Sequence, residues 1–345
     1  MTERNAGLVH VRTPTYKRPE ALKRALGSLI AQTWTNWVCD VYDDDPTGAG
    51  KAAVEALADP RIHYNHNSPQ RFASKNINQC FTAANPRSAD YFCVVEDDNY
   101  ILPTFFAENI ALCRQEGVEI LLRNQFIEHA SGTTEAHLSQ GGLLDRLYVD
   151  GLYQSEDFRQ SLLIGIGVSN GGLFWSRDTK CRLEIEYSTT ATLQEYMRTF
   201  SICEPIYVAM TPLAVWAENA EQTTRNAELK ASYLRRELDL KRSVQALQRA
   251  VWRRMSRQRR QQFLTDHRFA GDPTARARIL AKALLLPGLG GKLDRREALR
   301  LRARGFAIRT LGRLAPDFSA FVRSRLGTAP NTATDSAPRR QAVRA

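Results

Sequence analysis

Several features that would place a protein in a class at once are missing from this chain of 345 residues. None of its six cysteines forms a CxxC pair or stands at zinc-like spacing from a histidine, so the sequence predicts no zinc site. No apolar run approaches the length of about 18 residues that a membrane span needs, and no apolar segment follows the first residues. We therefore expect neither a transmembrane helix nor a secretory signal. Several cysteines lie in apolar runs, which predicts reduced core thiols and a cytoplasmic protein.

Charge is distributed unevenly along the chain. The net charge is +11, but residues 225–345 contain 29 Lys and Arg against 9 Asp and Glu, whereas residues 1–224 contain 19 against 28. An acidic globular part is therefore followed by a basic one. We expect a globular domain over 1–224, a basic helical region over 225–327 and a disordered tail over 328–345.

Short apolar runs alternate with helix-period segments through the first 125 residues. Strands are expected at 8–11, 37–42, 61–65 and 91–95, with helices after Pro19, over 73–84, after Pro103 and over 193–202, and a further strand at 206–210. This alternation predicts an α/β fold with a mostly parallel sheet flanked by helices. Ligands bind beyond the carboxyl ends of such strands, so Asp43–Asp45 and Glu96–Asp98 are expected to converge.

The tetrapeptide Glu96-Asp97-Asp98-Asn99 directly follows the apolar run Tyr91–Val95. Three adjacent acids at the end of a buried strand repel one another, and a bound cation commonly neutralises such a cluster. Carboxylate oxygens suit Mg²⁺ or Mn²⁺, ions that bridge to phosphate oxygens. A solvated acidic loop that merely ends the strand is the alternative.

Four motifs, in order over residues 8–110, resemble those of glycosyltransferase family 2. Val11–Pro19 (VRTPTYKRP) is similar to the strand–loop–helix that opens those enzymes, and Asp43-Asp44 ends a second strand as in their V-x-D-D motif. Phe72–Asn76 resembles the A-R-N element, and Val95–Asn99 the L-D-x-D-D element. The resemblance implies a GT-A fold and an inverting, metal-dependent transferase of the hexosyltransferase type. Its donor would be a nucleotide-diphosphate sugar, with a UDP-sugar favoured, and its setting the synthesis of cell-envelope polysaccharide or glycoconjugate.

The resemblance also assigns residues to the donor and to a divalent metal, Mn²⁺ or Mg²⁺. The metal ligands would be Asp98 and Glu96, although Glu96 replaces the aspartate of the family motif and so binds directly, through water or not at all. Lys75 would meet the diphosphate as a point charge, or else be a solvated helix residue. The donor-binding set is Thr13, Pro14, Thr15, Tyr16, Asp43, Asp44, Lys75 and Asp97.

Inversion needs a carboxylate that deprotonates the acceptor hydroxyl, and the resemblance favours Glu195 in the segment 192–198. Glu184 and Glu186 are the competitors for this role. The acceptor, a glycan or a lipid-linked sugar, would bind at Asn170, Gly171, Gly172 and Trp175. Glycine permits close backbone approach and tryptophan can stack on a sugar, but an ordinary turn and a core tryptophan are the alternatives.

The basic region 225–327 is open to three interpretations. Its arginines and interleaved apolar residues suit an anionic membrane surface, which predicts peripheral binding at the inner face of the membrane. They also suit nucleic acid, which we favour less, or packing against the acidic domain or a second subunit of a homo-oligomer. A catalytically degenerate domain that acts as a scaffold through this region is the main alternative to an enzyme. A nucleotidyltransferase fits less well because the first strand lacks a glycine-rich phosphate loop.

Overall fold

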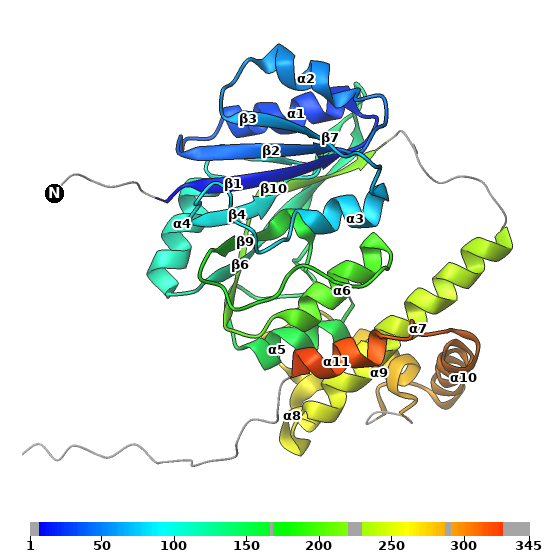
Figure 1. Cartoon of the computed structure of the whole chain (residues 1–345). Helices are drawn as coiled ribbons and strands as arrows, with labels where there is room; N and C mark the ends of the chain where they lie inside the picture. The colour runs from blue at the N-terminus through cyan, green and yellow to red at the C-terminus, as the bar shows by residue number, and fades with distance from the viewer. Residues whose placement is uncertain (1–6, 166–167, 220–229, 287–290, 327–345) are drawn as a thin grey trace, which may run out of the picture.

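The computed structural model describes residues 7–165, 168–219, 230–286 and 291–326 (Figure 1). The strands are β1 (Val9–Thr15), β2 (Trp37–Asp43), β3 (Ile62–His66), β4 (Tyr91–Val94), β5 (Tyr100–Ile101), β6 (Ile120–Ser131), β7 (His137–Gly142), β8 (Gly151–Tyr153), β9 (Leu173–Ser176) and β10 (Ile206–Asn219). The α-helices are α1 (Pro19–Ile30), α2 (Gly50–Leu57), α3 (Phe72–Gln79), α4 (Phe105–Glu116), α5 (Ser155–Arg159), α6 (Ala191–Ser201), α7 (Lys230–Arg254), α8 (Arg257–Gln262), α9 (Pro273–Leu284), α10 (Arg295–Leu311) and α11 (Phe318–Leu326). Single turns of 3₁₀ helix occur at η1 (Gln160–Leu163), η2 (Asn170–Gly172) and η3 (Phe263–Thr265).

One mixed sheet forms the centre of the molecule, in the order β3-β2-β1-β4-β9-β6-β10-β5. Strands β1 to β4 pair in parallel, as the sequence predicts. Strand β9 is inserted antiparallel between β4 and β6, so the sheet is less uniformly parallel than expected. The α/β fold with a helix-flanked sheet is confirmed.

Two apolar cores lie on opposite faces of this sheet. Helices α1, α2 and α4 cover one face. Helix α1 illustrates how the sequence forms it: Pro19 begins the helix with a preset backbone angle, and its apolar stripe, Leu22, Ala25, Leu26 and Leu29, is buried. Each fully buried leucine contributes about 1.5–3 kcal/mol. Ile30, also expected in the stripe, is 39% exposed because the helix ends there.

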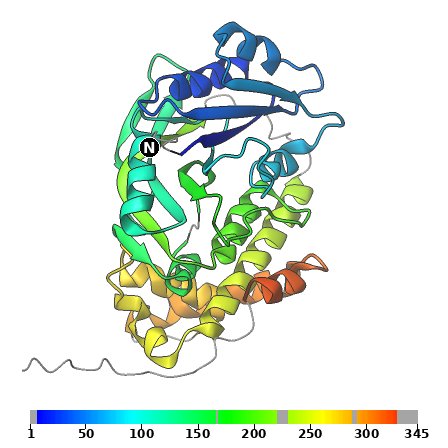
Figure 2. The ribbon, with the colours of Figure 1, turned by 60° about the vertical axis from the view of Figure 1, so that its left-hand side comes forward.

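The other face carries α6 and, beyond it, the helices of the basic region (Figure 2). Leu247 and Val251 of α7, Leu280 of α9 and Phe321 of α11 belong to the same buried cluster as Phe92 of β4. Phe321 lies 6.2 Å, ring centre to ring centre, from Phe200 of α6. The basic helices α7, α9 and α11 thus share a core with the acidic part of the chain.

The cysteines and the helices can be compared with the expectations of reduced core thiols and of no membrane span. Five cysteines are buried free thiols, as predicted, but Cys203 is exposed, because it follows the end of α6 rather than lying within it. None of the helices in the described ranges is both long and apolar enough to span a membrane. The segment 328–345, expected to be disordered, lies outside the described residues.

Candidate active site

The acidic tetrapeptide lies where β4 ends, beside the end of β1. Asp97 is buried and accepts hydrogen bonds from the Thr15 hydroxyl (2.8 Å) and the Tyr16 backbone N–H (3.2 Å). Arg18 pairs with Asp97 at 3.3 Å and with Asp98 at 2.5 Å. Burial, followed by repulsion from Asp98, raises the pKa of Asp97 to about 7. The two motifs that are distant in sequence therefore meet at one edge of the sheet.

Asp43 and Asp44 lie at the end of β2, and both carboxylates already accept hydrogen bonds from other groups of the protein. The Asp43 carboxylate accepts bonds from the backbone N–H of Asp45 and Gly50 and from the Tyr64 hydroxyl. The Asp44 carboxylate accepts the backbone N–H groups of Arg71 and Phe72, at 2.7 Å each. Both side chains are almost fully buried. In this structure they organise the loops that lead into α2 and α3, and neither offers a free surface to a nucleotide-sugar donor.

The remaining donor candidates differ in accessibility. Thr13 is fully buried, and its hydroxyl lies 3.6 Å from the Cys39 sulfur, so its side chain belongs to the core and not to a binding surface. Pro14 and Thr15 continue β1 and are also buried, whereas Tyr16 is half-buried at the end of the strand. Lys75 is exposed on α3. A nucleotide at this edge could therefore reach Tyr16 and Lys75 directly.

A cavity of about 220 Å³ adjoins the acidic tetrapeptide, and we call it the acidic cavity. Its walls are Glu96, Asn99, Leu143, Ser169, Asn170, Gly171, Glu195 and Trp216. Burial, and next the negative charge of Asp98, raise the pKa of Glu96 to about 8. Burial also raises the pKa of Glu195 to about 7, opposed by the positive charge of Arg198. Two carboxyl groups that exchange protons near neutral pH thus face one cavity.

Asn170 and Arg198 connect these two carboxyl groups. The Asn170 side-chain amide donates to Glu96 Oε1 at 3.0 Å and accepts from Arg198 Nη1 at 2.9 Å, while its backbone N–H donates to Glu195. Arg198 is fully buried, also donates to Leu183 O and Asn78 Oδ1, and lies over the Phe81 ring. Burial lowers the pKa of Arg198 to about 10. The buried cation Arg198 therefore holds Asn170 in place, and Asn170 in turn donates hydrogen bonds to both Glu96 and Glu195.

The two glycines of the predicted acceptor element are needed for packing. A Cβ on Gly172 would approach the Arg123 carbonyl oxygen to 2.3 Å, and one on Gly171 would approach the Gln125 amide to 3.0 Å. The 3₁₀ turn η2 can therefore lie directly on β6 and turn Asn170 into the acidic cavity.

The structure corrects the expectation for Trp175. It is 4% exposed and stacks between Phe81 and Phe92, at centroid distances of 5.5 and 5.9 Å. Because Trp175 pairs with Phe92 near the start of β4, it lies far along the strand from the acids. Trp216 of β10, 38% exposed, forms the aromatic wall of the acidic cavity instead.

The competing acids lie elsewhere. Glu184 and Glu186 line a different cavity, of about 370 Å³, with Trp175, Phe81 and the 176–183 loop. Of the three glutamates considered as the base, Glu195 alone lines the acidic cavity.

Sequence reasoning assigned no role to Arg18, Arg198 or Trp216. Arg18 belongs to the N-terminal motif Val11–Pro19, so its position next to the acids could have been predicted from the sequence. Arg198 lies three residues after Glu195, one helical turn further, which places both on one face of α6. Trp216 carried no such signal.

A helix-flanked sheet whose fourth strand ends in acids beside the loop after β1 defines the GT-A class of fold. Residues 11–165 match the model of Glycosyl transferase family 2. A relative, WcaA of Escherichia coli (strain K12), is a candidate colanic acid biosynthesis glycosyl transferase. It is 24% identical over 199 residues, which are 56% of this chain and 67% of WcaA.

The solved structures support the same fold. Residues 1–349 of TarS from S. aureus, in complex with UDP-GlcNAc, superpose with a TM-score of 0.52 at 12% identity. The match covers 88% of this chain and 92% of that one. The same TarS fragment in complex with UDP gives a TM-score of 0.50 at 12% identity, covering 88% and 91%.

Proposed function

We propose that this protein is an inverting glycosyltransferase that transfers a sugar from a nucleotide-diphosphate donor to a glycan or lipid-linked acceptor. The observation that carries the proposal is the acidic cavity, in which Glu195 faces Glu96 beside Asp98 at the carboxyl edge of β4. The name of WcaA and the UDP-GlcNAc bound to TarS support a nucleotide-sugar donor and a role in envelope polysaccharide synthesis. The catalytic unit would be residues 1–224, with 225–327 as its helical C-terminal region.

Glu195 is the proposed general base. Its carboxylate takes the proton of the acceptor hydroxyl while that oxygen forms a bond to the anomeric carbon of the donor. The bond between the anomeric carbon and the diphosphate oxygen breaks on the opposite face, and its electron pair leaves with the diphosphate. A pKa of about 7 suits this task, because the group is then ionised for part of the population at neutral pH and basic enough to accept the proton.

The acids at the end of β4 fit a divalent cation in charge. Burial and mutual repulsion raise the pKa values of Glu96 and Asp97, and a cation would relieve that repulsion. No three potential ligand side chains cluster within the described ranges, so Asp98, with or without Glu96, would hold Mn²⁺ or Mg²⁺ together with donor phosphate oxygens and water. Such an ion supplies Lewis-acid stabilisation of the departing diphosphate.

The acceptor would enter along Trp216 and Asn170. An exposed tryptophan can stack on the apolar face of a sugar ring, and Asn170 is held by Arg198 in a fixed orientation. Tyr16 and Lys75 would contact the donor nucleotide and its diphosphate.

Thermal shifts with UDP-, GDP-, CDP- and dTDP-sugars, each with and without Mn²⁺, test the donor site. A ligand at about 100 times its Kd should raise the free energy of unfolding by about 2.7 kcal/mol. We expect one nucleotide to act only with the metal, and Asp98→Asn to remove the shift. Asp178→Asn, at an exposed acid on a surface loop, is the matched control and should keep it. If no nucleotide shifts the wild type at saturation, the transferase proposal fails and a scaffold role replaces it.

A further inference from the structure

Two cysteines lie against each other, one in the loop before α6 and one just after the end of that helix. The Sγ atoms of Cys181 and Cys203 are joined by a thiol–thiol hydrogen bond of 3.7 Å. The backbone N–H of Cys203 also donates to Cys181 Sγ, at 3.3 Å. Both thiols are free. The two sulfur atoms are therefore in direct contact while still reduced.

Glu204 holds together the two segments that carry these thiols. Its Oε1 atom accepts from the Lys180 backbone N–H at 3.0 Å and from the Thr179 hydroxyl. The Cys181 Sγ atom lies 3.5 Å from the same oxygen. The loop at 179–181 is thus tied to the residues that follow α6, right beside the two sulfur atoms. Their approach is set by several bonds of the surrounding structure and not by one mobile side chain.

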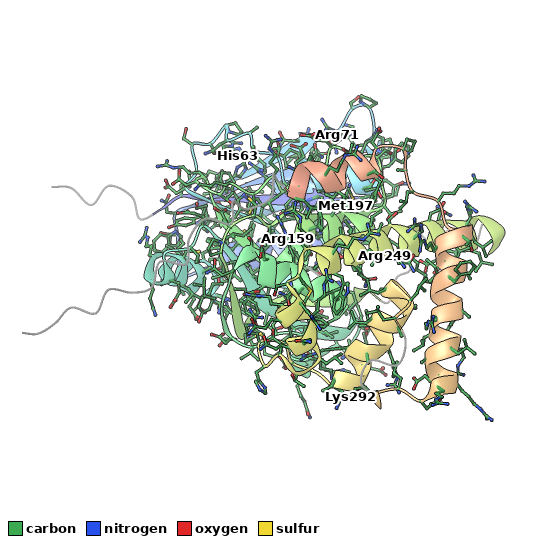
Figure 3. The ribbon with its side chains drawn as sticks, turned by 90° about the horizontal axis from the view of Figure 1, so that it is seen from below. His63, Arg71, Arg159, Met197, Arg249 and Lys292 are labelled. Atoms are coloured by element: carbon green, nitrogen blue, oxygen red, sulfur yellow. The ribbon has the colours of Figure 1, made fainter. Side chains whose placement is uncertain are left out.

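The two thiols differ in exposure and in acidity. Cys203 is exposed and lines a cavity between α5, α7 and α11 together with Arg159, which Figure 3 labels, whereas Cys181 is 7% exposed. The hydrogen bond between the thiols, and after it the positive charges of Arg159 and Arg325, lower the pKa of Cys203 to about 7. Burial and the charge of Glu204 oppose this effect. The same hydrogen bond, and next burial, raise the pKa of Cys181. A reagent therefore meets Cys203 first, partly as a thiolate, with a protonated Cys181 thiol behind it.

We propose that Cys181 and Cys203 form a disulfide bond when the protein meets a hydroperoxide, and that this bond ties the end of α6 to the loop before it. The Cys203 thiolate attacks one oxygen of the hydroperoxide, the O–O bond breaks, and the departing oxyanion takes a proton from water. Cys203 is then a sulfenic acid. The Cys181 sulfur attacks the Cys203 sulfur, the S–O bond breaks, and the leaving hydroxide takes the Cys181 proton to form water. The two thiols together lose two electrons, and the hydroperoxide is reduced to an alcohol and water.

The disulfide would close a segment of chain that contains all of α6. Cys181 and Cys203 are 22 positions apart, and α6 (Ala191–Ser201) lies between them. The loop already contacts the helix, because Leu183 O accepts from Arg198 Nε at 3.1 Å. A covalent bond across this segment restricts the unfolded chain and opposes separation of the loop from the helix. The inference is independent of the proposed transferase activity, because neither cysteine lines the acidic cavity.

Oxidation of the reduced full-length protein with equimolar hydrogen peroxide is the direct test. The number of thiols that iodoacetamide alkylates in denaturant should fall by two from the six of the chain. Peptide mass mapping without reduction should find Cys181 joined to Cys203. The Tm should rise by about 3–6 °C, because closing a loop of this length stabilises the folded state. Dithiothreitol should reverse all three changes.

Single substitutions separate the two steps. Cys203→Ser should abolish the disulfide and the rise in Tm. Cys181→Ser should stop the reaction at the sulfenic acid, which dimedone then traps on Cys203, because the thiol that would attack it is missing. Cys113→Ser is the matched control and should form the disulfide at the wild-type rate, since Cys113 is buried in α4 and burial raises its pKa.

Three results would overturn the proposal. In the first, Cys181 and Cys203 of the wild type both remain open to alkylation at a tenfold excess of peroxide. In the second, Cys203 joins only to a cysteine of another molecule, which a dimer on a non-reducing gel would reveal. In the third, dimedone labels Cys203 equally in the wild type and in Cys181→Ser, because Cys181 would then take no part in the reaction.

Discussion

Two cavities of the molecule differ in the sign of the charge on their walls. The acidic cavity is lined by Glu96 and Glu195, whereas a cavity of about 460 Å³, which we call the basic pocket, is lined by Arg159, Arg254, Arg259 and Arg325. In the acidic cavity the carboxyl groups of Glu96 and Glu195 are backed by the fully buried cation Arg198, and Asn170 holds all three in register. In the basic pocket the guanidinium groups of Arg159 and Arg254 donate hydrogen bonds to the backbone carbonyl oxygens of Arg325 and Leu326.

This difference determines whether the groups that line each cavity can exchange protons near neutral pH. Acids whose pKa values lie near 7 can exchange protons with a bound molecule, which is what a transferase base requires. Arginines remain charged throughout the physiological pH range, so the basic pocket can attract an anion but cannot exchange protons with it. The comparison predicts that substitutions in the acidic cavity change both the rate of the reaction and its pH dependence.

The largest expected effect is that of Glu195→Gln on turnover. If Glu195 is the base, the substitution should lower kcat about 10²- to 10⁴-fold, the range that general base catalysis typically supplies. The rise of the wild-type rate with pH, through an apparent pKa of about 7, should disappear as well. Glu184→Gln and Glu186→Gln, which alter acids in another cavity, are matched controls and should retain the rate and its pH profile.

The Glu195→Gln substitution should also change the free energy of unfolding, in a direction that the pKa of Glu195 determines. The pKa of Glu195 rises from 4.5 to about 7 on folding, so the native state binds a proton more tightly than the unfolded chain does. The associated stability is fully present below pH 4.5 and is lost as the pH rises through 7. Glu195→Gln should therefore raise the free energy of unfolding at pH 8 by on the order of 1–3 kcal/mol and change it little at pH 4.5. A destabilised variant at pH 8 would mean that the ionised form is favoured by folding.

The next largest effect is expected from Arg198→Leu, on the stability of the fold and on the pH dependence of the rate. The substitution removes a donor from the oxygens of Leu183, Asn170 and Asn78, of which Asn78 Oδ1 still accepts from the Ile185 N–H, and it removes the positive charge next to Glu195. We expect a loss of about 3–5 kcal/mol in urea unfolding, as for other buried charges whose partners are left behind. The rising limb of the pH–rate profile should also move to higher pH. Arg182→Leu, at an exposed arginine, is the control, and an equal loss there would contradict the role of the buried network.

Residues whose role depends on the strand ends could be predicted from the sequence. The acids of β2 and β4 follow apolar runs, and parallel strands place their carboxyl ends together, so the convergence of Thr15 with Asp97 was within reach. The alternation of apolar runs and helix-period segments predicted the first four strands and their parallel pairing, and both are confirmed. What the motifs did not reveal is that Asp43 and Asp44 hold loops, because their donors are backbone N–H groups at the starts of α2 and α3.

Roles that depend on long-range packing could not be predicted. Leu173-Phe174-Trp175 is apolar enough for a strand, but nothing local shows that it enters the sheet between β4 and β6. Arg198 meets Glu96 through Asn170, and the three come from different parts of the chain. Trp175 and Trp216 both lie in apolar segments, and only the register of β9 and β10 shows which one is buried.

The smallest effect we predict, that of Trp216→Ala, tests the wall of the acidic cavity. Loss of stacking on an acceptor sugar should raise the KM for the acceptor about five- to tenfold, because one aromatic contact contributes about 1 kcal/mol. The KM for the donor and kcat should change little, since the indole ring neither gives nor takes the transferred proton. Trp216→Phe keeps an aromatic face and should restore most of the affinity. Leu152→Ala, at a similarly exposed apolar residue outside the cavity, should leave the KM for the acceptor unchanged. A change in kcat with an unaltered acceptor KM would show that Trp216 supports the geometry of Glu195 and Asn170 instead, and would move the acceptor to another part of the cavity.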